Sequence, residues 1–298
     1  MAFRFCKTSQ HTTAPARLAR RVLFLAGMVA CLQAQPVAAA APCGEVITIG
    51  THGGSTTRYA LNRPDTLHAG KAPVALVLLP GGGGHLDLDD AGCPRALMGN
   101  SLVRSIALFS AEGFVTALVD APSDHPGEDG LAGFRVTTQH ADDLGKVIAD
   151  VRARTGLSVW LVGTSRGAIS AANAAARLAG HAAPDGVVLT SPVTYGSRGN
   201  KAWVAQSVFD LPLADIRVPL LVVGHGADQC LRSPARLNGD IALRIRDVRM
   251  QVVTVTGGPG GTAAPGIDAC QGRSPHGFIG QEAEVASGIA RFVRGGGY

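Results

Sequence analysis

Residues 158–167 read Ser-Val-Trp-Leu-Val-Gly-Thr-Ser-Arg-Gly, an apolar run that leads directly into the pattern G-x-S-x-G. A short apolar run stopped by glycine is typical of a buried parallel strand. The Ala-rich segment from Ala168 to Leu178 follows at once and predicts a helix. A turn this tight forces Ser165 into a strained backbone conformation, and its hydroxyl then projects at the sheet edge. The alternative is an ordinary serine at a helix N-terminus.

Strand and helix patterns alternate through the rest of the chain, which predicts the α/β class with a mostly parallel twisted sheet and helices on both faces. We expect the first two strands to form an antiparallel edge. The expected strands span residues 46–49, 56–61, 73–79, 114–119, 158–162, 186–189, 219–223 and 250–255. The expected helices span residues 102–112, 138–155, 168–178 and 281–293. In such sheets, functional residues gather where the strands end at their carboxyl edge.

Two residues after Ser165 complete a candidate catalytic triad. A serine hydroxyl is a weak nucleophile unless a base takes its proton, and that base needs an orienting acid. Asp228 follows the strand 219–223, and His276 lies between the last strand and the last helix. This is the chain order, acid and then histidine, that accompanies the strand-turn-helix serine. Because an imidazole must be neutral to act as a base, we expect rates to fall below about pH 6.5.

Other acids and histidines are weaker candidates. Asp120 precedes Ser165 in the sequence and is interpreted as a loop carboxylate, and Asp268 is a less suitable acid than Asp228. His225 is close to Asp228 and is more simply explained as a structural residue. The other histidines show no metal-ligand spacing, so we expect no metal site.

A glycine-rich loop follows the strand 73–79 and reads Pro80-Gly81-Gly82-Gly83-Gly84-His85. Glycines let a backbone approach a substrate oxygen closely. We expect the backbone N–H groups of Gly82 and Arg166 to hold the oxyanion of a tetrahedral intermediate. Gly83 is the next choice of donor. Four residues are candidates for the pocket wall: Gly83, His85, Trp203 and His225.

Charge and motif counts exclude several classes of protein. The chain has 298 residues, with 27 Lys and Arg against 22 Asp and Glu. Five basic residues and no acidic residue lie in residues 1–41, so the remainder is formally neutral. No basic face for nucleic acid is implied. No G-x-G-x-x-G follows a strand, and no phosphate-loop lysine follows the glycines, so we expect no nucleotide cofactor.

Residues 1–41 have the order of a signal peptide, namely a basic start, an apolar run at Val22–Ala30 and small residues before Pro42. The apolar run is too short to span a bilayer, so we expect no stable membrane insertion after its removal. The sequence predicts a protein exported to the periplasm or secreted, with residues 42–298 as its one domain. Lipid anchoring at Cys31 is a less favoured alternative. Cys43, Cys93, Cys230 and Cys270 remain, and an even number suits an oxidising compartment, although four cysteines allow three pairings.

Taken together, the oxyanion loop, the G-x-S-x-G turn, Asp228 and His276 resemble the α/β-hydrolase superfamily, in particular exported bacterial serine hydrolases. Two departures are Pro80, where the family often has histidine, and Arg166, whose guanidinium could favour an acidic or polar acyl group. The segment 191–218 is short for a cap domain, so we expect little or no lid. Neighbouring strand ends would bring Cys230 to Cys270, which leaves Cys43 to pair with Cys93.

The resemblance implies a serine hydrolase that cleaves small carboxylic esters through an acyl-enzyme. A peptidase or an acyltransferase could use the same triad. A catalytically silent fold that serves as a binding module is the alternative of a different class. Fold alone does not decide the substrate.

Overall fold

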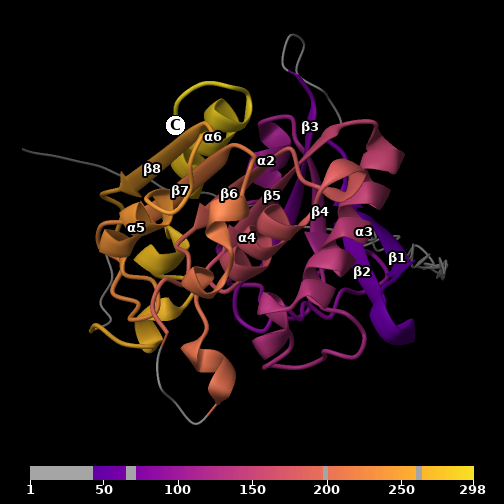
Figure 1. Cartoon of the computed structure of the whole chain (residues 1–298), viewed down its shortest axis with the longest axis horizontal. Helices are drawn as coiled ribbons and strands as arrows, with labels where there is room; N and C mark the ends of the chain where they lie inside the picture. Colours follow the sequence, from indigo (N-terminus) through magenta and orange to yellow (C-terminus); the bar gives the residue numbers. More distant parts are fainter. Residues whose placement is uncertain (1–42, 65–71, 197–200, 260–263) are drawn as a thin grey trace, which may run out of the picture. The chain divides into compact units, whose positions relative to one another are not determined.

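The computed structural model describes residues 43–64, 72–196, 201–259 and 264–298 (Figure 1). The expected signal peptide lies outside these residues. The described chain forms an eight-stranded sheet in the order β1-β2-β4-β3-β5-β6-β7-β8. Its strands are β1 (Glu45–Gly50), β2 (Thr56–Asn62), β3 (Val74–Leu79), β4 (Val115–Val119), β5 (Ser158–Thr164), β6 (Gly186–Thr190), β7 (Leu220–His225) and β8 (Met250–Val255). β1 and β2 run antiparallel at one edge, and the remaining six strands are parallel.

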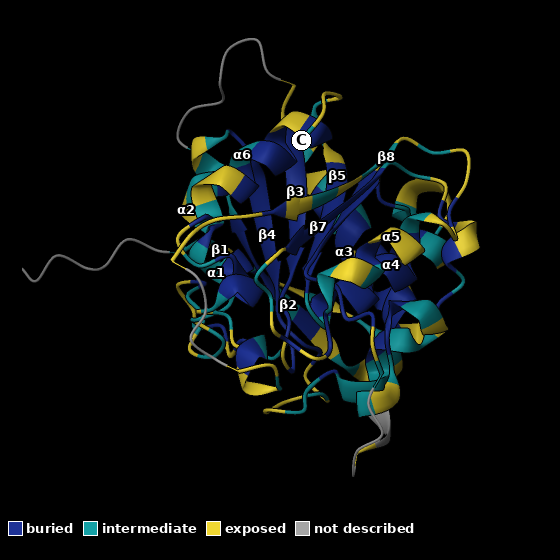
Figure 2. Ribbon diagram, turned by 90° about the vertical axis from the view of Figure 1, so that its left-hand side faces the viewer, coloured by how far each residue is buried: buried dark blue, intermediate teal, exposed yellow. Residues whose placement is uncertain are grey.

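Helices cover both faces of this sheet. They are α1 (Ser101–Arg104), α2 (Ile106–Ala111), α3 (Thr138–Thr155), α4 (Gly167–Arg177), α5 (Asn238–Ala242) and α6 (Glu282–Val293). Figure 2 shows the buried strands between α1, α2 and α6 on one side and α3, α4 and α5 on the other. Short 3-10 helices lie at His52–Gly54, Ala132–Val136, Gly180–Ala182, Ala202–Ala205, Val208–Asp210, Leu213–Asp215, Ala235–Leu237, Asp268–Cys270 and Pro275–Gly277.

The central strands are apolar throughout because both of their faces are covered. In β3, Ala75, Val77 and Leu79 pack in the core under α3 and α4, while the alternating residues pack in the second core under α2 and α6. Successive side chains of a strand point to opposite faces, so a strand covered on both sides reads as one continuous apolar run. The continuous apolar run 73–79 therefore predicts a buried parallel strand, and β3 pairs in parallel with β4 and β5.

Helix ends follow local capping chemistry. The Thr137 side chain accepts a hydrogen bond from the His140 N–H at the start of α3, and Gly156 ends that helix in the left-handed conformation. The single helix expected at 102–112 is wrong in one respect, because the chain breaks at Ser105 into α1 and α2. The short helix α5 was not expected.

The segment between β6 and β7 carries no lid in its described part. Residues 191–196 and 201–218 contain only short 3-10 helices. Phe209 packs against the core, and Tyr195 is exposed. Among the described residues, no helix is long and apolar enough to cross a membrane.

Candidate active site

Ser165 sits in the turn between β5 and α4. Its φ of 53° lies in the left-handed region, which a residue with a side chain rarely adopts. The Ser165 N–H donates to the Thr190 carbonyl at 2.9 Å, and its own carbonyl accepts from the Ala168 N–H at 3.1 Å. The neighbouring strand and the first turn of α4 therefore hold this strained backbone in place.

Glycines flank Ser165 because other backbone segments approach it closely. A Cβ on Gly163 would lie 2.4 Å from the Gly167 carbonyl oxygen, and a Cβ on Gly167 would lie 2.0 Å from that of Leu79. A Cβ on Gly81 would lie 2.9 Å from the Ser165 Cβ. These are distances at which no side chain fits, so the pattern G-x-S-x-G reflects packing of the turn against the end of β3.

His276 and Asp228 form a buried pair. The His276 Nδ1 lies 2.8 Å from the Asp228 Oδ2, and both side chains are almost completely buried. The second oxygen of Asp228 accepts from the Cys230 N–H at 2.8 Å. Ser191 Oγ donates to the His276 carbonyl at 2.8 Å and so fixes the backbone of this loop. When Nδ1–H donates to a carboxylate, the neutral imidazole keeps its lone pair on Nε2.

Ser165 and His276 line the same cavity, which has a volume of about 210 Å³. Gly81 and Gly82 lie on its wall, together with Leu97 and Gly99. His276 Nε2 is buried and has no hydrogen-bond partner among the described residues. A buried acceptor without a partner, in a cavity that also contains a serine, is available to act as a general base. The hydrogen bond between a catalytic base and its nucleophile often forms only once substrate is bound.

The glycine loop after β3 is held by two buried charged side chains. Arg135 donates to the carbonyls of Pro80 at 3.1 Å and Gly82 at 3.3 Å. Directly after the loop, the backbone N–H groups of Leu86 and Leu88 donate to the Asp120 carboxylate at 2.6 Å and 3.1 Å. The loop carrying the expected oxyanion donor is therefore fixed in its backbone orientation.

Sequence reasoning missed Arg135. It lies in the 3-10 helix Ala132–Val136, is 1% exposed, and also donates to Ser170 Oγ at 2.7 Å. Burial lowers the pKa of its guanidinium, and the nearby Arg166 lowers it further. Nothing in a single sequence marks an arginine that acts on a loop 55 residues earlier in the chain. Asp120 is a loop carboxylate, as the sequence indicated.

Arg166 lies in a second cavity that adjoins the first. This cavity has a volume of about 510 Å³ and shares Gly82 and Leu97 with the cavity of Ser165. Gly83 and His85, both expected in the pocket, also line it. Burial lowers the pKa of Arg166 to about 10; the positive charge of Arg232 adds to this lowering, and Asp129 opposes it.

The remaining pocket candidates differ in their placement. His225 is buried away from both cavities, where its Nδ1 accepts from the Ala227 N–H at 3.0 Å and its Nε2 lies 2.6 Å from the Gln281 Oε1. It therefore has a structural role at the end of β7. Trp203 belongs to the 3-10 helix Ala202–Ala205, and its side chain lies outside the described part of the structure.

Two disulfides join the pairs expected from the sequence. Cys230–Cys270 links the loop of Asp228 to the segment that leads to His276. Cys43–Cys93 ties the first described residue to the loop between β3 and α1. Disulfides of this kind are typical of proteins in oxidising compartments.

Arg104 joins the wall of the cavity to the histidine loop. Its guanidinium donates to the carbonyls of Gly99, Gly272 and Gly277 and pairs with Glu282 at 2.7 Å. All three glycines line the cavity of Ser165. The position of the His276 loop therefore depends on one side chain of α1 and one of α6.

Comparisons with known proteins agree on the fold. No family model matches the chain, and no curated protein matches it in sequence. An α/β serine hydrolase homologue from Coxiella burnetii is 18% identical, with a TM-score of 0.54 over 84% of this chain and 97% of that chain. The esterase Est2 from Thermogutta terrifontis is 16% identical, with a TM-score of 0.53 over 85% and 93%.

A serine hydrolase without lid from Xanthomonas campestris is 16% identical, with a TM-score of 0.50 over 80% of this chain and 91% of that chain. Together with the sheet order and the helices on both faces, these similarities show that the chain has the α/β-hydrolase fold. At sequence identities this low, the comparisons support the fold alone, and the activity has to be argued from the site.

Proposed function

We propose that this protein is a serine hydrolase that cleaves carboxylic esters of small molecules. The observation that carries the proposal is the unpartnered Nε2 of His276, in the cavity that the strained Ser165 lines and at the end of a buried pair with Asp228. A histidine that is held by a carboxylate and shares a cavity with a serine is the arrangement expected of an activated serine nucleophile.

In the proposed reaction, Ser165 Oγ attacks the ester carbonyl carbon and His276 Nε2 takes the hydroxyl proton. The negative charge moves to the carbonyl oxygen, where the backbone N–H groups of Gly82 and Arg166 would stabilise it. His276 then gives the proton to the departing alcohol, which leaves an acyl-enzyme on Ser165. Water, deprotonated by His276, attacks the acyl carbon, and the carboxylic acid leaves as Ser165 recovers its proton. Asp228 orients the imidazole and stabilises its protonated form.

The surroundings of Ser165 support small polar substrates. No lid covers the site in the described part of the segment between β6 and β7. Arg166 lines the adjoining cavity together with Gly82, one of the proposed oxyanion donors. A desolvated arginine favours a ligand with a carboxylate or another polar oxygen. We therefore propose an acidic or polar acyl group. The disulfides support export, with residues 1–41 as a cleaved leader.

Labelling with a fluorophosphonate tests the proposed function. The purified, oxidised protein should form an adduct on Ser165, mapped by mass spectrometry. Ser165→Ala should abolish the adduct and His276→Ala should reduce its rate strongly, while a variant of the structural histidine, His225→Gln, serves as the matched control. A panel of esters, amides and acyl acceptors then separates an esterase from a peptidase or an acyltransferase. If folded protein formed no adduct, the proposal would fail and a binding module would remain.

A further inference from the structure

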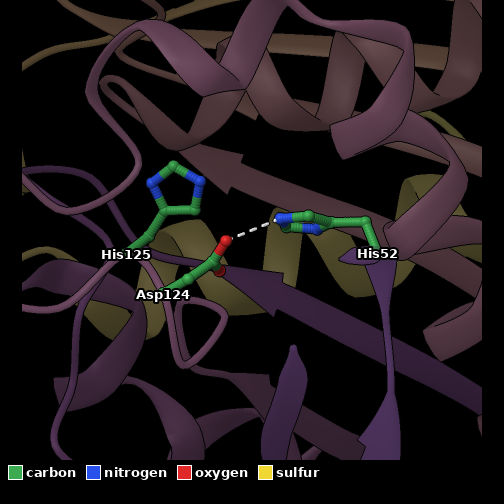
Figure 3. A group of neighbouring side chains, drawn as sticks. All are labelled: His52, Asp124 and His125. Atoms are coloured by element: carbon green, nitrogen blue, oxygen red, sulfur yellow. Dashed lines mark hydrogen bonds and ion pairs between the residues drawn. The ribbon is translucent and has the colours of Figure 1, made fainter. Parts of the chain in front are cut away.

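A second group of histidines and carboxylates lies outside the candidate active site. His52 belongs to the turn between β1 and β2, while Asp124 and His125 belong to the loop after β4 (Figure 3). One ligand atom from each of these three residues lies within 4.8 Å of the others. Figure 3 shows the Asp124 carboxylate pointing toward the His52 ring, with the His125 ring beside it. We propose that His52, Asp124 and His125 bind a zinc ion, with Asp143 as the residue that orients His52.

Asp143 supports this assignment because it contacts the other nitrogen of the same ring. The His52 Nδ1 donates to the Asp143 Oδ2 at 2.5 Å, and Asp143 is a nearly buried residue of α3. Histidine ligands of metals commonly donate their second ring nitrogen to a carboxylate, which fixes the tautomer and the ring orientation. The Nε2 of His52 then faces Asp124, and the Nε2–Oδ2 distance is 2.8 Å.

Phe134 contacts both imidazole rings. The His125 ring stacks on Phe134 with centroids 4.3 Å apart, and the His52 ring lies 4.8 Å from the same phenyl ring. The backbone is fixed as well: Ser123 and Thr56 exchange two hydrogen bonds between the loop after β4 and the start of β2. The ligand set is thus largely preorganised, and only side-chain rotations would bring the donors to the spacing of about 3.3 Å that tetrahedral zinc requires.

Donor chemistry and charge select the ion. Two imidazole nitrogens and one carboxylate suit Zn²⁺, whereas Mg²⁺ and Ca²⁺ prefer oxygen ligands alone. The carboxylates of Asp124 and Asp143 balance the charge of a divalent ion. The Asp124 side chain is 48% exposed, so an ion can enter from solvent and water can fill the remaining coordination position. The sequence could not show this site, because its ligands come from two loops and lack metal-ligand spacing.

Such a site would tie the β1–β2 turn to the loop after β4. An ion that binds only the folded chain stabilises it. The site does not depend on the proposed activity at Ser165, so either idea can fail without the other. A zinc-dependent rise in melting temperature is the expected consequence.

Calorimetric titration with Zn²⁺ on untagged, metal-stripped protein tests the proposal, with Co²⁺ absorption as a reporter of imidazole ligation. We expect saturable binding of one ion per chain and a higher melting temperature. Asp143→Asn should weaken binding by about 10- to 100-fold, the usual effect of losing such a hydrogen-bond partner. His125→Ala, a change in an exposed loop, should abolish the saturable phase, as should His52→Gln.

Two control variants test whether zinc binds at other histidines. His181→Ala removes an exposed histidine elsewhere. His276→Ala removes the imidazole of the second group of possible metal ligands among the described residues. Both should bind zinc as the unchanged protein does. The proposal is overturned if the unchanged protein shows no saturable zinc binding, which would leave an ion-pair cluster. It is also overturned if binding survives in folded His125→Ala, or if it disappears only in His276→Ala.

Discussion

At the scale of single residues, Arg135 is the least expected feature of the site. Its buried guanidinium donates to two carbonyls of the glycine loop and so fixes the orientation of the peptide groups at Pro80 and Gly82. Removing a donor from buried acceptors costs the full desolvation penalty of those acceptors. Arg135 is thus a positioning residue for the proposed oxyanion donor, although it touches no reacting atom.

We predict that Arg135→Met lowers kcat by about 10- to 100-fold. This loss is smaller than the largest losses seen when an oxyanion donor itself is removed. KM should change little, because the loop would still be present but no longer fixed. Arg135→Lys should restore part of kcat by supplying one of the hydrogen bonds. Arg177→Met, a change on α4 at a residue that hydrogen-bonds Asn173, is the matched control. Steady-state kinetics on one ester would decide, and equal kcat values for Arg135→Met and the control would refute the role.

A second prediction at this scale concerns Arg166, whose pKa is lowered to about 10, chiefly by burial. Below that pH the guanidinium is charged and can bind an acidic acyl group; above it the charge is lost. The ratio of kcat/KM for a succinyl ester to that for a butyryl ester should therefore fall as pH rises through about 10. Arg166→Gln should lower the ratio by about 10-fold at neutral pH and remove its alkaline decline. An unchanged ratio in this variant would exclude the contact with substrate.

At the scale of elements, α1 and α6 position the histidine loop through Arg104 and Glu282. Burial alone would raise the pKa of Glu282, but the hydrogen bonds from Arg104 and from backbone N–H groups outweigh it and lower the pKa. A carboxyl whose pKa is lower in the folded state contributes stability above its unfolded pKa, and this contribution is lost as pH falls through the folded value.

Glu282→Gln should consequently reduce the free energy of unfolding by about 1–2 kcal/mol at neutral pH. The difference from the unchanged protein should shrink as the pH falls below the ordinary glutamate pKa of about 4.5 and through the lowered value of Glu282. Urea unfolding at a series of pH values measures this. Glu284→Gln controls for charge in the first turn of the same helix, because Glu284 is exposed and has no arginine partner among the described contacts. A loss independent of pH would contradict the assigned pair.

The sequence predicted the elements better than it predicted the contacts between them. The run 158–162 and the helix after it were foreseen because burial on both faces and helical spacing leave a local pattern. The break at Ser105 was missed because the residues on both sides of it are equally apolar. The rule that functional residues follow the carboxyl ends of parallel strands predicted that Ser165, Asp228 and His276 lie together. No local pattern predicted the roles of Arg104, Arg135 and the group around His52, because these depend on long-range packing.

At the scale of the whole molecule, two disulfides close the described chain over loops of 50 and 40 residues. Cys43–Cys93 fixes the start of the domain, and Cys230–Cys270 fixes the acid loop against the histidine segment. Cross-links of this length stabilise by about 2–4 kcal/mol through the unfolded chain. Both bonds should therefore contribute to stability, while only the second should matter for the proposed triad.

Replacing each pair by serine separates these contributions. The Cys43→Ser, Cys93→Ser protein should unfold at lower urea yet label with fluorophosphonate at an unchanged rate. The Cys230→Ser, Cys270→Ser protein should lose comparable stability and also label several-fold more slowly, because the Asp228 and His276 loops can then move apart. The disulfides also allow a test of export. Residues 42–298 made in a reducing cytoplasm should show both the lower stability and the slower labelling until the protein is oxidised. The full chain made in an exporting bacterium should carry both bonds. Equal labelling rates in the two serine pairs would show that the second disulfide has no role in the site.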